Sequence, residues 1–213
     1  MMGLKRTVLA LVVVLAPAWA MAQQSVIDPY YKVLLSQLHP EDVGAMEGWE
    51  EAMRAHFSDL KASGALDAAS QEAAVEMIAL LDLARLPITR DEMIGDWSFK
   101  SYQTDSLGAF AYTFFNGRIY PEGEALVLDK SGGSQRHFGY LAQAREDALF
   151  FAGALSYSYD PRPRLYSSME ANPDGESRER DATAEIYKIG DGRYLMVFAP
   201  DNGRFRLYEI VPR

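Results

Sequence analysis

The spacing of apolar residues changes once along this chain, and that change constrains the fold more than any other feature. Between residues 28 and 85, apolar side chains recur at steps of three and four, as in Val43, Met46, Trp49 and Met53. This is the spacing of amphipathic helices. After residue 92, short runs rich in Tyr, Phe, Val and Leu alternate with turn signals about every ten residues, which is typical of antiparallel strands joined by hairpins. The chain therefore predicts an α+β protein in which the helices precede the strands.

The segment from residue 28 to 85 predicts two to three helices. Asp28 can cap a first helix that starts at Pro29 and ends before Pro40. A second helix is expected from Pro40 until Gly64, which is a C-terminal stop signal. A third is expected from residue 67 or 70 to about residue 85. We expect these helices to pack on the strands as a lead-in to one larger fold.

The remainder of the chain predicts about eight strands. They are expected to begin near Ile94, Phe110, Glu124, Gln135, Ala148, Thr183, Arg193 and Arg204. Tight hairpin turns are predicted where both central residues tolerate a positive φ, at Asn116-Gly117, Asp191-Gly192 and Asn202-Gly203. Such a meander is expected to close into a small barrel, because closure removes the exposed sheet edges. A β-sandwich is the alternative.

The amino-terminal residues have the three parts of a cleavable signal peptide. Lys5 and Arg6 form a positive region, residues 7–16 are apolar, and Ala20-Met21-Ala22 is a small-x-small cleavage site. The apolar run is shorter than the ~20 residues that a membrane span needs. We therefore expect cleavage near Ala22-Gln23 and a mature protein in the periplasm or outside the cell. The expected organisation is a signal peptide at 1–22, a helical lead-in at 23–91 and a barrel at 92–213.

Charge and cysteine content exclude several classes of partner and site. Removal of residues 1–22 takes away Lys5, Arg6 and no acidic residue, so the net charge changes from −9 to −11. An acidic surface repels nucleic acid and anionic lipid. No nucleic-acid partner and no membrane span after cleavage are therefore expected. Because the chain has no cysteine, it has no disulfide, thiolate metal site or lipid-bearing thiol.

The chain carries no motif of a known catalytic or cofactor site. His39, His56 and His137 lack the spacing that gathers a metal ion. Ser134 follows a glycine but lacks the second glycine of a nucleophile elbow, and no phosphate-binding loop is present. We therefore assign no catalytic residue, no metal ligand and no cofactor, and lean toward a protein that is not an enzyme. A dispersed carboxylate pair or Ser/His set is the alternative.

Four segments carry a resemblance to a known family. They are Ile94-Gly95-Asp96-Trp97, the run from Lys130 to Tyr140, Phe150 to Ala154, and Gly203 to Pro212. In this order they resemble a bacterial exported family known only as a domain of unknown function (number 4893). The resemblance covers most of the mature chain, and it brings no activity with it.

A second resemblance, at the level of the fold, is to lipocalin-like barrels. Those barrels have Gly-x-Trp in the first strand and an arginine on the last strand that packs over the tryptophan. Gly95-x-Trp97 and Arg204 or Arg206 fit this layout. The resemblance implies that Trp97 and Arg206 form a barrel-closing cation–π pair, which is a structural role.

Arginines and tyrosines in the strand region are the candidate ligand-binding residues. They are Arg118, Arg136, Tyr140, Arg164 and Tyr166. A guanidinium can bind a carboxylate or phosphate through two parallel hydrogen bonds. The alternative is that these arginines pair with the many acidic residues of the surface.

Three functions remain open, in this order of preference. The first is a non-enzymatic module that binds a small apolar or anionic ligand at the barrel mouth, flanked by the long segment 156–182. The second is a protein-interaction or protease-inhibitor-like module whose partner is an envelope protein. The third is a hydrolase with a dispersed site.

Overall fold

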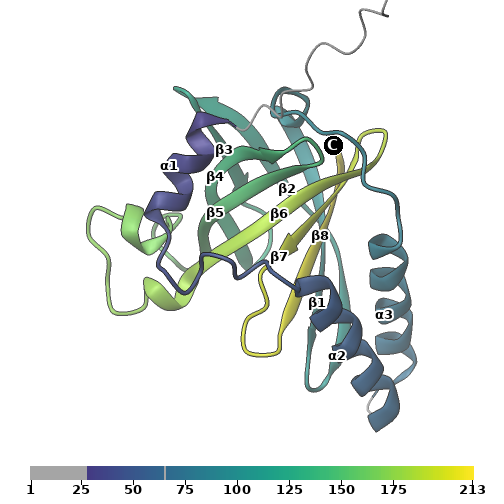
Figure 1. The fold of residues 1–213 in the computed structure, drawn as a ribbon. Coiled ribbons are helices and arrows are strands. Elements are labelled where there is room, and N and C mark those ends of the chain that lie inside the picture. Colours follow the sequence, from purple (N-terminus) through teal and green to yellow (C-terminus); the bar gives the residue numbers. More distant parts are fainter. Residues whose placement is uncertain (1–27, 65) are drawn as a thin grey trace, which may run out of the picture.

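A computed structural model describes residues 28–64 and 66–213 of the chain, and it has three helices followed by a closed antiparallel barrel (Figure 1). The predicted signal peptide lies outside the described residues. The helices are α1 (Pro29–Gln37), α2 (Trp49–Ser63) and α3 (Ala68–Leu81), with short 3₁₀ turns η2 (Asp91–Met93), η3 (Ser167–Met169) and η4 (Arg178–Arg180). The strands are β1 (Gly95–Asp105), β2 (Gly108–Glu122), β3 (Ala125–Lys130), β4 (Gln135–Arg145), β5 (Ala148–Tyr157), β6 (Asp181–Gly190), β7 (Arg193–Phe198) and β8 (Phe205–Pro212). Each strand pairs with the next, and β8 pairs with β1, so the predicted α+β fold and closed eight-stranded barrel are confirmed.

The helix boundaries follow their capping residues, with one correction. The Asp28 side chain accepts a hydrogen bond from Tyr30 N at the start of α1. The second helix was expected from Pro40, but α2 begins at Trp49. Gly44 and Gly48 have φ of +85° and +67°, and this left-handed backbone interrupts a helix. Residues 38–48 therefore form a separate connection between α1 and α2.

All eight strands begin within two residues of the positions expected from the sequence. The turns at Asp191-Gly192 and Asn202-Gly203 are confirmed, with positive φ at Gly192, Asn202 and Gly203. The turn predicted at Asn116-Gly117 is wrong, because both residues lie inside β2. A Cβ on Gly117 would lie 2.6 Å from the Phe99 ring, so this glycine serves close packing rather than a turn.

The helices cover two parts of the outer barrel surface (Figure 1). Met53 and Phe57 of α2 and Met77 of α3 belong to a buried cluster with side chains of β1, β7 and β8. Leu34 of α1 belongs to a second buried cluster with Phe150 of β5. Within the described part of the chain, none of the helices is long and apolar enough to cross a membrane.

One end of the barrel interior is filled by side chains. Trp97 Nε1 donates a hydrogen bond to the Met93 carbonyl of η2 at 2.7 Å, which holds that turn across the barrel end. The Phe151 ring fits against two facing glycines, Gly139 and Gly153, where any Cβ would lie under 3 Å from it. This close packing closes one end and leaves the other end available for a cavity.

Candidate functional site

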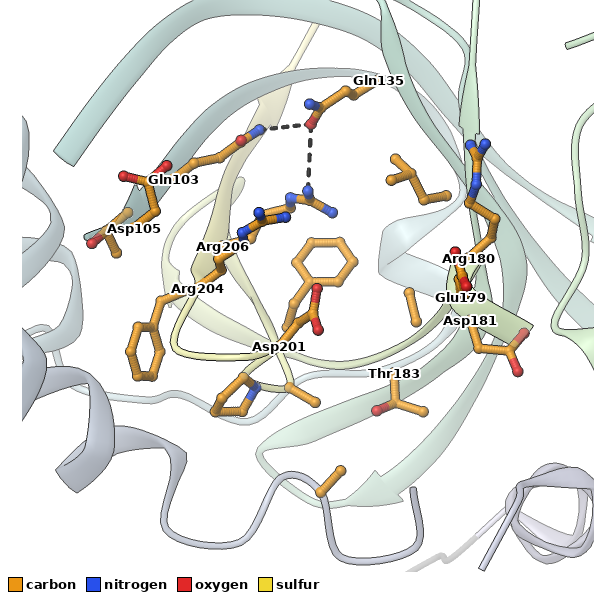
Figure 2. A pocket seen from close by; sticks show the side chains of 18 of the residues that line it. Gln103, Asp105, Gln135, Glu179, Arg180, Asp181, Thr183, Asp201, Arg204 and Arg206 are labelled. Carbon is orange, nitrogen blue, oxygen red and sulfur yellow. Dashed lines mark hydrogen bonds between the residues drawn. The ribbon is translucent and has the colours of Figure 1, made fainter. Parts of the chain in front are cut away.

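The barrel has a cavity of about 920 Å³ at the end opposite Trp97, which we call the barrel mouth. Its walls come from the far ends of the strands and from the connections at that end, including Asp42 of the α1–α2 connection. Glu179, Arg180, Asp181 and Thr183 form one side of it (Figure 2). The wall includes the apolar and aromatic side chains of Phe110, Tyr112, Leu155, Tyr157 and Phe198. The mouth therefore combines apolar and aromatic side chains with a larger set of polar and charged ones, six of which are acidic: Asp42, Asp105, Glu176, Glu179, Asp181 and Asp201.

Arg206 of β8 is the cation on the floor of the mouth. Its Nη1 donates to His137 Nε2 at 3.1 Å, and its Nη2 donates to Gln135 Oε1 at 3.4 Å. Its Nε is buried without a hydrogen-bond partner. No carboxylate of the described residues lies within 4.0 Å of this guanidinium, so the charge has no ion-pair partner within the described protein.

His137 and Tyr208 lie beneath Arg206 in the barrel interior. Both are buried, and His137 Nδ1 lies 2.7 Å from the Tyr208 hydroxyl. Burial and the nearby Arg206 and Lys130 charges hold the pKa of His137 well below its ordinary value. The ring is therefore neutral, and because arginine only donates, Nε2 accepts and Nδ1 carries the proton. Burial also raises the pKa of Tyr208 to about 12, so no anion in this layer balances the guanidinium.

Lys130 at the end of β3 adds a second buried cation to this layer. The residue is 2% exposed, and its Nζ donates to the carbonyls of Gly132 at 2.9 Å and Gln135 at 2.7 Å. No acidic side chain of the described ranges forms an ion pair with it. Burial, with the charge of nearby Arg206, lowers the pKa of Lys130 to about 8. Lys130 does not itself line the cavity, and we refer to Arg206 and this lysine beneath it as the floor cations.

The arginines on the rim of the mouth differ from the floor cations. Arg178 pairs with Asp42 at 3.0 Å and with Asp181 at 3.3 Å, and Arg180 pairs with Glu176 at 2.8 Å. These rim charges are balanced by carboxylates and are partly in contact with water, so they contribute little net field. Arg178 and Arg180 are thus paired with carboxylates, whereas Arg206 is not. The mouth also carries Arg204, Asp105, Glu179 and Asp201, none of which forms an ion pair with another described residue.

Three of the residues predicted to bind a ligand are arginines, and each already has a partner away from the cavity. Arg118 is on the outer barrel surface, 58% exposed, 3.5 Å from an oxygen of Asp129. Arg136 Nε donates to a backbone carbonyl at 3.2 Å. Arg164 binds Asp174 through two hydrogen bonds of 2.9 Å. None of the three lines the mouth.

The two predicted tyrosines lie beneath the α1 region rather than at the mouth. Tyr140 packs edge-on against Tyr30. Tyr166 is buried; its hydroxyl donates to Asp42 and accepts from His39 N. Tyr166 thereby ties the α1–α2 connection to the segment between β5 and β6. The structure does not bring the five predicted residues together.

Trp97 and Arg206 are also separated. In the pairing of β1 with β8, Trp97 lies opposite Pro212 and Arg206 lies opposite Gln103, six residues along β1. At about 3.3 Å per residue this places them roughly 20 Å apart along the strand. Arg206 instead lies over the Phe198 ring at 5.7 Å, and the Trp97 ring packs against another aromatic side chain. Each residue acts at its own end of the barrel.

Strand alternation is the signal that could have identified the floor residues. Leu126, Leu128 and Lys130 occupy alternate positions of β3, as do Gln135 and His137 of β4. Side chains two residues apart point to the same face of a sheet. Lys130 follows Leu126 and Leu128 on the same face of β3, so it is a candidate interior residue. Choosing candidates by residue type alone instead favoured arginines on the outer surface.

Metal ligation has no support among residues 28–64 and 66–213, since no group of three or more His, Asp and Glu side chains there is arranged to hold an ion.

Comparison with known proteins gives one match. The model of the family described as Domain of unknown function (DUF4893) matches residues 35–206, which include all three helices in part or whole and every strand up to Arg206 of β8. No curated protein and no solved structure matches the chain.

Proposed function

This chain belongs to the DUF4893 family of domains of unknown function, and we propose that its barrel binds a small amphipathic anion in the mouth. The family membership brings no activity, so the proposal rests on the chain's own side chains. It is a binding function without a chemical step, because the floor carries cations and a neutral histidine but no nucleophile paired with a base.

The observation that carries this proposal is the pair of floor cations without a carboxylate. Buried charges are normally paired, because an isolated charge in a low-dielectric interior is costly. Arg206 has a buried Nε without a partner, and Lys130 has a lowered pKa. A carboxylate or phosphate bound at the Arg206 guanidinium would supply the missing charge.

The aromatic and aliphatic side chains of the mouth indicate what the remainder of the ligand, beyond its anionic group, would be. Phe110, Tyr112, Leu155 and Tyr157 offer apolar and aromatic surface above Arg206. The volume of about 920 Å³ lies in the range of small-molecule sites, roughly 300–1,000 Å³. An organic acid with an apolar or aromatic body fits both features, with its anionic end on the floor.

The test is a titration with a matched pair of probes. We expect cis-parinaric acid to bind the protein and its uncharged methyl ester to bind at least tenfold more weakly. Arg206→Gln should weaken acid binding by about 10- to 100-fold, because a charged hydrogen-bond partner is worth roughly 1.5–3 kcal/mol. The control is Arg118→Gln, which removes an outer, exposed arginine and should leave the affinity within twofold. Equal binding of acid and ester would overturn the proposal.

The proposed place of action is the periplasm or the cell exterior. This part of the proposal rests on the signal peptide predicted at residues 1–22. A cavity open to that compartment would meet small acids from outside the cytoplasm. An envelope protein as the partner remains the competing proposal.

A further inference from the structure

Part of β2 has an open edge in the barrel wall. β2 extends from Gly108 to Glu122, but β3 pairs only with residues 118–122 of it. One more backbone hydrogen bond, from Gly132 N to Asn116 O at 2.8 Å, follows on that side. Beyond it, residues 109–115 have β1 as their sole backbone partner among the described residues. Their outward N–H and C=O groups are thus available to another strand.

The start of β4 is open in the same place. β3 reaches only as far as the pair Lys130–His137, so Gln135 and Arg136 pair with β5 alone. The β3–β4 turn lies below, where Gly133 stands against the Phe115 ring. We call this gap, between residues 109–115 of β2 and the start of β4, the wall notch. It opens beside the cavity, because side chains from both of its borders line the mouth.

The open edge lacks two of the features that natural sheets use to block pairing, charge and proline, although α3 packs against β2. Residues 108–117 contain no charged residue and no proline, in a chain of which 24% is charged. Phe110, Tyr112 and Phe114 remain 39%, 44% and 44% exposed. Edge strands are usually protected by charge, proline or a cover. An uncharged aromatic edge of this kind suits the addition of an extended strand.

We propose that the ligand of the mouth is an extended peptide that adds to the open edge of β2 and places a carboxylate on Arg206. This inference rests on the proposed function and names its ligand class. Arg206, Gln103 and Phe110 form one row across β8, β1 and β2. An added strand would be the next member of that row, at the spacing of about 4.8 Å between neighbouring strands.

Side chains already meet across the cavity at this level. Gln135, on the far border of the notch, accepts from Gln103 at 2.8 Å and from Arg206 at 3.4 Å (Figure 2). A carboxylate from a strand in the notch would therefore approach the same guanidinium past Gln103 and Gln135, and it would displace the hydrogen bond between them. Apolar side chains of the peptide would face Phe110 and Tyr112.

Charge decides between a peptide and a second copy of this chain. Two copies could pair through their own β2 edges, but residues 108–117 hold no carboxylate. Such a dimer would cover the backbone and leave both floor cations unbalanced. An acidic peptide satisfies the backbone and the charge together. The acid can be a C-terminal carboxylate or an Asp or Glu side chain.

The experiment selects peptides and then tests how they bind. Random heptapeptides, prepared once as free acids and once as C-terminal amides, are selected on the protein comprising residues 23–213. In the free-acid pool, we expect the C-terminal carboxylate alone to be enough for binding. In the amide pool, we expect the selected peptides to be enriched in Asp or Glu. Arg206→Gln should weaken the selected peptides at least tenfold, and Arg118→Gln should leave them within twofold.

Methylation of the peptide backbone tests strand addition without changing the protein. In an antiparallel pair, only every second residue directs its N–H to the partner. N-methylation at successive positions should therefore weaken binding at least tenfold at alternate positions only. Uniform sensitivity or uniform tolerance would overturn strand addition.

The remaining outcomes separate the two proposals. If no peptide binds while cis-parinaric acid still binds through Arg206, the peptide inference fails and the proposed function stands. If neither probe binds, both fail. If sedimentation shows a dimer that Thr113→Lys dissociates, a second copy occupies the edge and the inference is overturned.

Discussion

Replacing Lys130 by methionine tests whether the interior cation is as poorly solvated as its surroundings indicate. The lysine is 2% exposed, donates to two backbone carbonyls and has no ion-pair partner in the described ranges. Methionine keeps the length and removes the charge. At neutral pH the lost hydrogen bonds, about 1 kcal/mol each, offset much of the gain from removing the charge. The pH dependence of stability is the cleaner measure.

The magnitude follows from linkage between protonation and folding. Burial lowers the pKa of Lys130 from 10.5 to about 8. Between these values the unfolded chain holds a proton that the folded protein has lost, so the contribution to stability rises with pH and is lost as pH falls through about 8. At about 1.4 kcal/mol per pH unit, the whole change amounts to about 3 kcal/mol.

Urea unfolding of wild type and Lys130→Met, from pH 7 to 10.5, measures this change. The other titrating groups, tyrosines included, contribute alike to both proteins, so the difference in unfolding free energy isolates Lys130. We expect the unfolding free energy of wild type to rise, relative to that of the variant, by about 3 kcal/mol between pH 7 and 10.5. A difference that stays flat would show that Lys130 keeps an ordinary pKa, and would refute the argument that the floor holds an unbalanced charge.

Three further predictions follow from the fold and the chain start. Gly153→Ala should lower the unfolding free energy by about 3 kcal/mol or more in urea, because its Cβ would lie 2.3 Å from a carbonyl oxygen, whereas Gly175→Ala, with open space around it, should change little. Trp97→Phe should cost about 2 kcal/mol in the same assay, through a lost buried hydrogen bond and lost volume; an unchanged midpoint would contradict this. Mass spectrometry of the exported protein should find Gln23 as its first residue, and retention of residues 1–22 would refute cleavage there.

The architecture was predictable because it depends on local patterns. Helical spacing before residue 85 and strand alternation after residue 92 are properties of neighbouring residues, and the strand starts follow from them. The errors came where tertiary packing overrides a local preference. Asn116-Gly117 has the composition of a turn, but Gly117 is a glycine because the Phe99 ring lies where its Cβ would be.

The site was less predictable, because it depends on which face of a strand each residue occupies and on which strands end early. Arg118 and Arg206 are the same residue type in one sheet, yet one faces water and the other faces the cavity. Alternation could have placed Lys130 inside once the strands were known. The wall notch requires knowing that β3 stops at Lys130 while β2 continues to Gly108.

The barrel interior divides stability and binding between its two ends. At the closed end, Phe151 packs against Gly139 and Gly153 at contact distance, and apolar burial there contributes to stability. Across the interior, the lowered pKa of Lys130 corresponds to a penalty of about 3 kcal/mol at neutral pH, which its two hydrogen bonds to carbonyls partly offset. An all-apolar layer would avoid that penalty. A layer that is unfavourable in the empty barrel and becomes favourable when an anion binds is the arrangement expected of a binding site, so variants that stabilise this layer with apolar side chains should lose affinity as they gain stability.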